Sequence, residues 1–397
     1  MKKFLKGLFF VILAFVVIFG GLAVANRINE RAMHEYIDSF GAVEHESQLK
    51  PEFDENGAPY FVTDDDFKVM QITDVHIGGG FLSVTEDKKA INAVAAMITT
   101  EKPDLVIVTG DISFPVPWIG TLNNRFAHEM FAHLMENLGV YWTVSFGNHD
   151  SEAYNFYTRA QVAKMYESEN HKYCLFDRGP EGLYGECNHY IYIKNTEDII
   201  TRAFIIVDTN AYTDEDPLGI KWIYDNIHED QIEWYENTIN TLNTHNSNLG
   251  AGEVKSMLFY HIPLMEMREA VNEYNENGES EELKHHFGKV GEDDPYVYCS
   301  MEAEEMFETI VRLGSTEATF FGHDHLNNIV LEYKGVIMSY GYSIDYLAYS
   351  DIDLVGSQRG CTVINCSPDG GFEIIHENYY QDKYIPLYEK EVVDLTN

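Results

Sequence analysis

Side chains that can bind metal ions follow several apolar runs in this sequence. Three runs end in Asp74-Val75-His76, in Gly110-Asp111 and in Gly147-Asn148-His149-Asp150, and two later ones end in His261 and in Gly322-His323-Asp324-His325. Carboxylate, amide oxygen and imidazole donors together suit borderline divalent metals such as Mn, Fe, Co or Zn, rather than the all-oxygen shell of calcium. These residue types predict a transition-metal site.

Short runs of β-branched and aromatic residues predict the strands that position these side chains. The runs cover residues 67–73, 104–109, 140–146, 204–207, 257–260 and 319–321, and helical patterns over 85–100 and 125–138 separate the first three. This alternation indicates βαβ units and a largely parallel sheet. Asp74, Asp111 and Asn148 follow one another at steps of 37 residues (111 − 74 and 148 − 111), as two successive crossovers would give. Because ligands bind at the carboxyl ends of such strands, we expect the motifs to meet at one edge.

Later runs have the character of hairpin strands in an additional, more antiparallel sheet. They cover residues 189–193, 329–333, 336–340, 361–365 and 372–376. Residues 269–298 are rich in Glu and Asn, so we expect a solvated surface loop, with a mobile lid near the site as the alternative. Asp324 is expected in a solvated turn, and Trp118 is a candidate for stacking on an organic leaving group or for plugging a loop base.

The N-terminal segment indicates a location outside the cytoplasm. Lys2, Lys3 and Lys6 precede an uncharged, mostly apolar stretch from Gly7 to Ala25, about long enough to span a bilayer as a helix. The Ala23-Val24-Ala25 sequence instead fits cleavage by a signal peptidase. A buried core helix is disfavoured because no charge interrupts the run. The rest of the chain is therefore expected outside the cytoplasm. It would be attached to the cell membrane by an N-terminal anchor, or secreted if the chain is cleaved after Ala25.

The expected organisation has four parts. They are a transmembrane anchor or signal peptide over 1–25, a stalk or linker over 26–63, a globular domain over 64–380 and a tail over 381–397. Five cysteines are compatible with an oxidising compartment. Cys174 and Cys187 flank a Gly-rich turn region and are the favoured disulfide pair, whereas the other three cysteines are expected to be buried thiols.

Composition limits the partners. The chain of 397 residues has 27 Lys and Arg against 65 Asp and Glu, a formal net charge of −38, and 45% apolar residues. That apolar share is too high for a disordered chain, and the length suffices for one large or two modest domains. The acidic excess argues against nucleic-acid binding and against docking on an anionic membrane surface. A small ester approaches such a molecule more easily than a polyanion does.

The order of the motifs makes the chain resemble the calcineurin-like metallophosphoesterases. That family has the blocks D-x-H, G-D, G-N-H-D/E, a lone His after a strand, and G-H-x-H, which occur here from Asp74 to His325. The segments QITDVHIG, DLVIVTGDIS, FYHIPLMEM and FFGHDHLNN look like the branch related to purple acid phosphatases that includes Dcr2-type phosphatases. The resemblance covers most of residues 65–376. It implies an α/β (α+β) fold: a four-layer αββα sandwich of two mixed β-sheets flanked by helices.

The resemblance also implies a role for each motif residue. Seven would ligate two metal ions: Asp74, His76 and His325 the first, Asn148, His261 and His323 the second, and Asp111 both. A hydroxide between the metals would attack phosphorus, with His149 as general acid or transition-state stabiliser and Asp150 orienting it. Arg359 is a candidate for holding the substrate phosphate, although a structural Arg paired with a carboxylate is slightly favoured.

One position departs from the purple acid phosphatases. Their tyrosine ligand lies three residues after the bridging Asp, and Phe114 stands there in this chain. A phenyl ring cannot ligate a metal, so iron–tyrosinate colour is not expected. The implied cofactors are two divalent or mixed-valence ions, Mn, Fe or Zn, with their identity open.

These features lead to an expected function. It is the two-metal hydrolysis of a small phosphate ester, with a phosphomonoesterase slightly favoured over a phosphodiesterase acting on a small diester. A nonenzymatic metal-binding envelope protein is the alternative from another class. The sequence identifies no protein partner.

Overall fold

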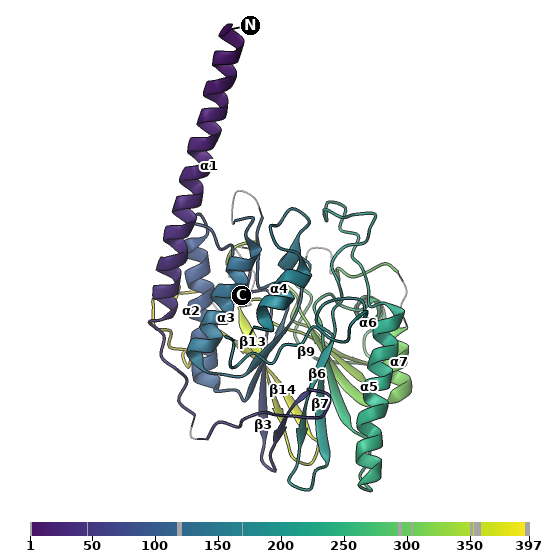
Figure 1. Ribbon diagram of the computed structural model, residues 1–397. Coiled ribbons are helices and arrows are strands. Elements are labelled where there is room, and N and C mark those ends of the chain that lie inside the picture. Colours follow the sequence, from purple (N-terminus) through teal and green to yellow (C-terminus); the bar gives the residue numbers. More distant parts are fainter. Residues whose placement is uncertain are drawn as a thin grey trace.

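The described part of the chain forms two β-sheets that lie face to face, with helices on the outer face of each (Figure 1). The computed structural model describes residues 2–45, 47–116, 121–168, 170–292, 296–302, 305–349, 352 and 359–393. Trp118 lies outside these ranges. The expected four-layer αββα sandwich is confirmed.

The smaller sheet carries the first three motifs. Its five strands lie in the order β14 (Phe372–Asn378), β13 (Gly360–Cys366), β3 (Phe67–Ile72), β4 (Leu105–Thr109) and β5 (Trp142–Ser145). Strands β3, β4 and β5 are parallel and β13 is antiparallel to its neighbours. Helices α2 (Val84–Glu101) and α3 (Asn124–Leu138) connect the parallel strands, so the predicted βαβ units are confirmed.

The larger sheet carries the last two motifs. Its nine strands lie in the order β1 (Glu52–Phe53), β2 (Pro59–Val62), β6 (His189–Lys194), β7 (Ile200–Ile206), β8 (Lys255–Phe259), β10 (Thr316–Phe321), β12 (Val336–Tyr340), β11 (Val330–Tyr333) and β9 (Leu283–Phe287). Strands β7, β8, β10 and β12 run parallel. Strand β6 is antiparallel to β7 but parallel to β2, and β11 is antiparallel to both β12 and β9.

The division of the strands between the sheets differs from the prediction. The later strands do not form a separate sheet, because β13 and β14 extend the smaller sheet beside β3, and β6, β11 and β12 belong to the larger one. The strands β7, β8 and β10, expected beside β3 to β5, also lie in the larger sheet. Apolar runs indicate strands but do not specify which strand pairs with which, so the pairing could not be derived from them.

Alternating side chains explain why the sheets stack. In β3, Phe67 and Val69 face the layer between the sheets, while Met70 and Ile72 face the helices. Burial of both faces makes the strand apolar throughout. Helices α1 to α4, the last being Arg159–Tyr166, cover the smaller sheet, and α5 (Glu229–Asn248), α6 (Met265–Asn277) and α7 (Met306–Leu313) cover the larger.

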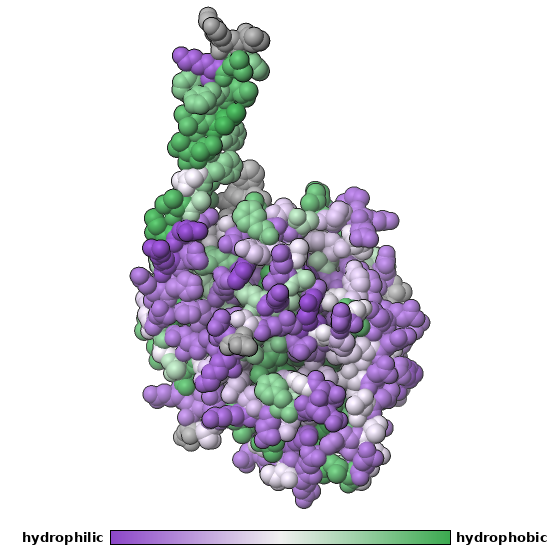
Figure 2. Space-filling model, in the orientation of Figure 1, coloured by the Kyte–Doolittle hydropathy of each residue, from purple (hydrophilic) through white to green (hydrophobic). Residues whose placement is uncertain are grey.

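Helix α1 (Lys2–Ile37) projects from the body and then packs on it (Figures 1 and 2). Residues 4–24 are exposed along their whole length, whereas Met33 and Ile37 are 0% exposed and belong to the core against α2 and α3. It is the one helix in the described part of the chain that is long and apolar enough to cross a membrane, with a mean hydropathy of 2.9 over its most apolar window.

Two expected flexible segments are folded against the body. Residues 26–63 were expected to form a stalk, but they include the packed end of α1 and strands β1 and β2, because Met33, Ile37 and Phe61 are apolar side chains that fit the core. In the expected tail, Tyr384 is 1% exposed and its hydroxyl donates to Glu101. The stalk assignment is therefore wrong, while the outer limits of the domain remain a prediction.

The acidic insertion 269–298 is not only a loop. It contains most of α6 and the edge strand β9, which pairs with β11 and buries Leu283. Charged residues hid this strand because an edge strand exposes alternate side chains to water.

The five cysteines are free thiols, so the predicted Cys174–Cys187 disulfide is wrong. The backbone of Cys174 forms an isolated β-bridge with Trp142 at the start of β5. The Cys187 Sγ accepts a hydrogen bond from the Phe146 N–H, just after the end of β5. Four residues of strand separate these positions by about 13 Å. A disulfide needs Cα atoms within about 7 Å of each other.

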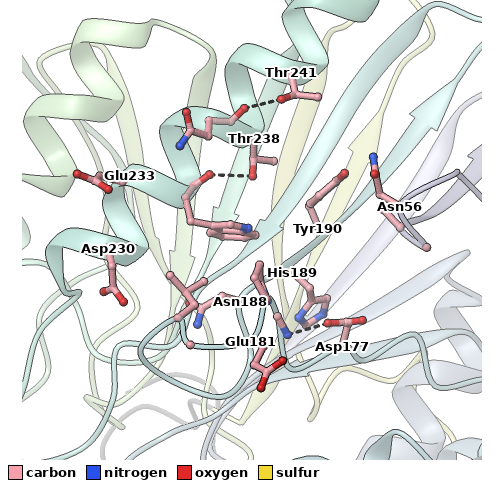
Figure 3. A pocket seen from close by; sticks show the side chains of 18 of the residues that line it. Asn56, Asp177, Glu181, Asn188, His189, Tyr190, Asp230, Glu233, Thr238 and Thr241 are labelled. Atoms are coloured by element: carbon pink, nitrogen blue, oxygen red, sulfur yellow. Dashed lines mark hydrogen bonds between the residues drawn. The ribbon is translucent and has the colours of Figure 1, made fainter.

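A pocket of about 710 Å³ lies away from the motifs (Figure 3). It is lined by α5, the start of β6, the β1–β2 turn and residues 177–183, and none of the candidate ligands lines it. This pocket is therefore separate from the candidate ligands at the strand ends.

Candidate metal centre

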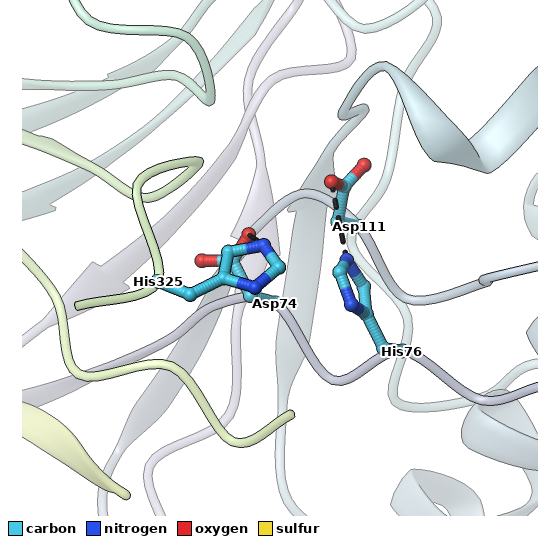
Figure 4. A group of neighbouring side chains, drawn as sticks. All are labelled: Asp74, His76, Asp111 and His325. Atoms are coloured by element: carbon cyan, nitrogen blue, oxygen red, sulfur yellow. Dashed lines mark hydrogen bonds and ion pairs between the residues drawn. The ribbon is translucent and has the colours of Figure 1, made fainter. Parts of the chain in front are cut away.

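The five motifs come together where the carboxyl ends of strands from both sheets meet. The candidate ligands form two groups, and within each group the donor atoms all lie within 4.8 Å of one another. One group is Asp74, His76, Asp111 and His325, and the other is Asp111, His261 and His323. Figure 4 shows the first group. Asp111 belongs to both groups, so its carboxylate lies between two adjacent clusters of donors.

The backbone at this edge is held in unusual conformations. The Asp74 N–H donates to the Gly110 carbonyl at 3.1 Å, and the His76 N–H to the Asp111 carbonyl at 3.0 Å. Four residues have positive φ angles, namely Asp74 (51°), His76 (53°), Asp111 (53°) and His323 (76°), out of nine non-glycine residues with positive φ in the described chain. Such concentration of backbone strain is typical of functional sites.

The glycines of the motifs make room for this close approach. A Cβ atom on Gly147 would collide with the Asp111 carboxylate and would lie 2.6 Å from the Asp111 backbone nitrogen. A Cβ atom on Gly322 would collide with the Thr73 hydroxyl and would lie 2.5 Å from Asp74 Oδ2. The glycines therefore permit the candidate ligands to pack directly against neighbouring strand ends.

Asp111 is a buried carboxylate surrounded by donors. Its Oδ2 lies 3.3 Å from His76 Nε2 and 3.1 Å from His261 Nε2, and its Oδ1 accepts the His149 backbone N–H at 2.8 Å. Burial alone would raise the pKa of the Asp111 carboxyl, but the His261 and His149 imidazoles hold it well below its usual range. Asp111 is therefore ionised.

The second group has its donor atoms close together. His261 Nδ1 lies 2.8 Å from the Thr109 carbonyl, which can only accept, so Nδ1 carries a proton and Nε2 points toward Asp111, 3.1 Å from its Oδ2. Burial would lower the pKa of His261, but Asp111 raises it to about 9. The Asn148 amide donates to the Tyr212 hydroxyl at 2.9 Å, and its Oδ1 lies 3.2 Å from His261 Nε2. Burial, together with the charge of His261, holds the pKa of His323 well below its usual range, so this imidazole is neutral.

A residue absent from the sequence prediction, Asp345, orients the first group. This carboxylate is 0% exposed, and its oxygens lie 3.3 Å from His76 Nδ1 and 2.9 Å from His325 Nδ1. Burial would raise the pKa of the Asp345 carboxyl, but His76 and His325 hold it well below its usual range. The Nε2 atoms of these two rings lie 3.3 Å from Asp111 Oδ2 and 3.6 Å from Asp74 Oδ1. A polar Ser-Ile-Asp shortly after a predicted strand was the available signal.

The segment that carries Asp345 is fixed beside Asp74. The Asp345 N–H donates to the Asp74 carbonyl at 2.9 Å and the Ile344 N–H to the Thr73 carbonyl at 3.2 Å. The Ser343 hydroxyl donates to Asp74 Oδ2 at 3.2 Å. A sixth chain segment therefore completes the candidate centre.

Arg359 supports this segment, and the structure contradicts a direct contact with substrate. Its guanidinium is 1% exposed, donates to the Ile344 and Asp345 carbonyls at 2.9–3.0 Å, and donates to the Tyr380 hydroxyl at 2.7 Å. It also lies over the Tyr346 ring. The alternative structural role is the one observed, through backbone carbonyls more than through carboxylates.

Glu152, rather than Asp150, is the partner of the His149 side chain. His149 Nδ1 lies 2.7 Å from Glu152 Oε1, and the imidazole is 25% exposed. Asp150 instead accepts the backbone N–H groups of Asp111, Ser113 and Gly147 at 2.8–3.0 Å. The prediction that Asp150 orients the His149 side chain is therefore wrong, because the Asp150 carboxylate binds backbone N–H groups and Glu152 binds His149 Nδ1.

Two further residues near the centre have clear surroundings. The Phe114 ring stacks on His76 with centroids 4.8 Å apart and meets His149 edge-on at 4.9 Å, and the His76 and His149 rings also meet edge-on at 5.6 Å. Asp324, expected in a solvated turn, is 3% exposed and accepts from the Tyr340 hydroxyl and the Tyr298 N–H. Burial raises the pKa of Asp324 well above its usual range.

Comparisons with known proteins agree with the expected resemblance. The family described as calcineurin-like phosphoesterase matches residues 67–327. The "Probable inactive purple acid phosphatase 28" of Arabidopsis thaliana is 23% identical over 316 residues, 73% of each chain. "Phosphatase DCR2" of Saccharomyces cerevisiae is 25% identical over 289 residues, 67% of this chain and 45% of that protein. A solved dimetal phosphatase from Danio rerio covers 80% of this chain and 97% of its own, with 12% identity and a TM-score of 0.47.

Proposed function

This chain belongs to the calcineurin-like phosphoesterase family of phosphoester hydrolases, and from that premise we propose that it hydrolyses a phosphate monoester at a two-metal centre. The observation that carries the proposal is the position of Asp111, whose buried carboxylate is common to two groups of donor atoms. A carboxylate shared in this way is suited to bridging two cations about 3.5–4 Å apart.

The donors fit borderline divalent cations. His323 Nε2 is a buried nitrogen without a hydrogen-bond partner among the described residues, and His261, whose Nδ1 is bound to the Thr109 carbonyl, points its Nε2 toward Asp111. Imidazole nitrogens combined with carboxylates and one amide oxygen suit Mn, Fe or Zn. The choice among these metals is left to the experiment below.

We assign seven residues as ligands on this basis. The first cation would be held by Asp74, His76 and His325, the second by Asn148, His261 and His323, and both by Asp111. Asp345 would act as the positioning residue of the first site, since a carboxylate on Nδ1 fixes the imidazole tautomer and orientation.

The chain's own residues would handle the leaving group. Two bound cations would supply Lewis acidity and an activated water. His149 lies at the exposed side of the centre with Nδ1 bound by Glu152, so its Nε2 is the atom able to donate a proton to the leaving oxygen. Asp150 fixes the backbone that joins Asp111 to His149, and Phe114 packs against the His76 and His149 rings.

The names of the relatives do not decide activity for this chain. Three of them carry the word inactive in their printed names, whereas "Phosphatase DCR2" does not. The donor set and the His149–Glu152 pair are complete here. This completeness favours an enzyme over a protein that only binds metal.

The test is a hydrolysis assay on metal-stripped full-length protein with Mn, Fe or Zn restored separately. We expect an aryl phosphate monoester to be hydrolysed faster than the matching bis-aryl diester, with at least one metal. Asp111→Asn should abolish turnover, while Asp104→Asn, a carboxylate bound to the Lys68 N–H at the far end of β4, should retain it.

Two outcomes would contradict the proposal. Faster turnover of the diester would favour the phosphodiesterase alternative. Absence of turnover with every metal, together with metal-dependent thermal stabilisation, would favour the metal-binding envelope protein.

A further inference from the structure

We propose that the catalytic edge faces the bilayer and that the substrate is a phosphate monoester carried by a membrane lipid. The catalytic edge is defined as the carboxyl ends of β3, β4, β5, β8 and β10 with the loops that follow them. This inference rests on the proposed function and deepens it by naming the substrate class. It also takes α1 as an uncleaved anchor.

The anchor and the body form one continuous helix. The uncharged segment Gly7–Ala25 has 19 residues, about 28 Å of helix, which matches the hydrocarbon thickness of a bilayer. The helix continues without a break to Ile37, where Met33 and Ile37 are buried in the core. The membrane segment is therefore attached to the body by packed helix and not by a mobile linker.

The point where α1 leaves the bilayer contacts the first motif loop. The Phe81 N–H donates to Asn26 Oδ1 at 3.1 Å, and the Asn29 amide donates to the Gly80 carbonyl at 3.0 Å. Phe81 is five residues after the candidate ligand His76, a chain length that spans at most about 18 Å. The membrane surface at Asn26 is therefore close to the candidate metal centre.

Apolar side chains form a rim on this edge. We define the rim as six exposed residues on three loops: Phe81 (36% exposed), Leu82 (56%), Phe156 (68%), Leu218 (50%), Ile220 (74%) and Trp222 (63%). Figure 2 shows apolar side chains on the end of the body from which α1 projects. Exposed apolar patches mark interaction sites, and Trp is favoured at the level of lipid head groups.

The loops of the rim are attached to the centre itself. Loop 211–224 begins at Tyr212, whose hydroxyl accepts from Asn148, and ends at Tyr224, whose ring lies 4.5 Å from His323. Between these two tyrosines the chain carries Leu218, Ile220 and Trp222 outward. The apolar tips thus surround a polar centre, as required where a head group enters from a membrane.

The charge of the chain is compatible with this arrangement. A net charge of −38 opposes the approach of a soluble anion from solution. A lipid in the same bilayer arrives by lateral diffusion and needs no long-range attraction. Near the helix exit, Arg27, Arg31 and Arg125 line a cavity of about 570 Å³, together with Glu30 and Glu129.

The experiment uses the full chain reconstituted in phosphatidylcholine vesicles. Release of phosphate is measured from vesicles that contain phosphatidic acid, from vesicles that contain a polyprenyl phosphate, and from soluble p-nitrophenyl phosphate. We expect turnover of at least one lipid. The variant Phe156→Ser/Ile220→Ser/Trp222→Ser should lower lipid turnover at least tenfold and leave p-nitrophenyl phosphate turnover within twofold.

A matched control removes exposed apolar side chains from the opposite edge. Leu249 follows α5 and Val311 lies in α7, both close to the amino ends of β8 and β10, and they are 47% and 41% exposed. Leu249→Ser/Val311→Ser should change neither activity. A fluorophore at Phe156→Cys should be quenched by doxyl-labelled lipids, and one at Leu249→Cys should not.

The outcomes separate the two proposals. Turnover of p-nitrophenyl phosphate without turnover of either lipid, equal effects of the rim and control variants, or absence of lipid quenching at position 156 would overturn the membrane inference alone. Absence of turnover on all three substrates would overturn the proposed function. A mature chain that begins at Asn26 would also overturn the anchored orientation.

Discussion

Asp345 is a carboxylate shared by two imidazoles, and this geometry makes its side chain testable. An amide cannot accept from both Nδ1 atoms, so Asp345→Asn would turn a donor toward one ring. We expect the affinity of the first metal site to fall about 10–100-fold, with the second site unchanged. Calorimetric titration of the stripped protein measures both sites.

Asp104→Asn is the control, because this carboxylate binds backbone at the opposite end of the sheet. Equal weakening of both sites by Asp345→Asn would indicate general loss of structure and would contradict a positioning role. Recovery with Asp345→Glu would support that role.

Because His149 pairs with Glu152, substitutions of the two neighbouring carboxylates Glu152 and Asp150 should have different effects. Glu152→Gln should lower kcat by about 10–100-fold with little change in KM, since general-acid catalysis depends on the orientation of His149. Its melting temperature should remain that of the parent protein. Steady-state kinetics and thermal unfolding on the same preparation test both statements.

Asp150→Asn should behave in the opposite way. It accepts three backbone N–H groups, so its loss should lower the melting temperature and metal content together. A variant that kept both and lost only kcat would restore Asp150 as the partner of His149.

Among single residues, the sequence identified the candidate metal ligands better than the residues that position them. The two geometric groups contain only residues named from the motifs, because strand ends in parallel sheets converge. Asp345 was missed because it contacts His76, which is far away in the sequence. Glu152 was missed because its contact with His149 depends on the local fold of the turn that joins them. The two roles weighed for Arg359 could not be separated by sequence, because a buried guanidinium and a phosphate-binding one look identical there.

At the scale of elements, the strand-to-loop turns are the critical parts. Gly147→Ala should reduce metal content at both sites, since the added Cβ atom meets the Asp111 carboxylate and backbone nitrogen. We expect a lower melting temperature as well. Metal analysis and thermal unfolding provide the measurement.

Gly252→Ala is the matched control, because a Cβ atom there meets nothing within 4 Å. If Gly147→Ala bound metal like the parent protein, the close packing of the strand ends would not be what positions Asp111.

The elements themselves were largely predictable, and their partners were not. Strand β12 (Val336–Tyr340) has the predicted limits, α2 differs from prediction by one residue at each end, and α3 differs by one residue at its start. The pairing of β13 with β3 joins residues about 295 positions apart, for example Val363 with Met70. No local periodicity contains that information.

At the scale of the molecule, the two halves of α1 should behave differently when removed. Deletion of residues 1–25 should yield a folded protein, because these residues are exposed, up to a partly exposed Ala25. Deletion of residues 1–37 should destabilise it by about 3–6 kcal/mol, the burial free energy of Met33 and Ile37. Denaturant unfolding compares the two truncations.

Equal stability of the truncated proteins would contradict the packing of the helix end on α2 and α3. Loss of folding on removal of residues 1–25 alone would mean that the apolar half also supports the body.

The positive φ angles of Asp74, His76, Asp111 and His323 link metal supply to protein abundance. Each left-handed conformation costs about 1–2 kcal/mol, so cations bound by these residues would stabilise the backbone as well as the side chains. Folding of this edge and cation binding would then be thermodynamically coupled. In a compartment starved of metal, quality control would remove the chain itself. The amount of protein would therefore report on the local metal concentration.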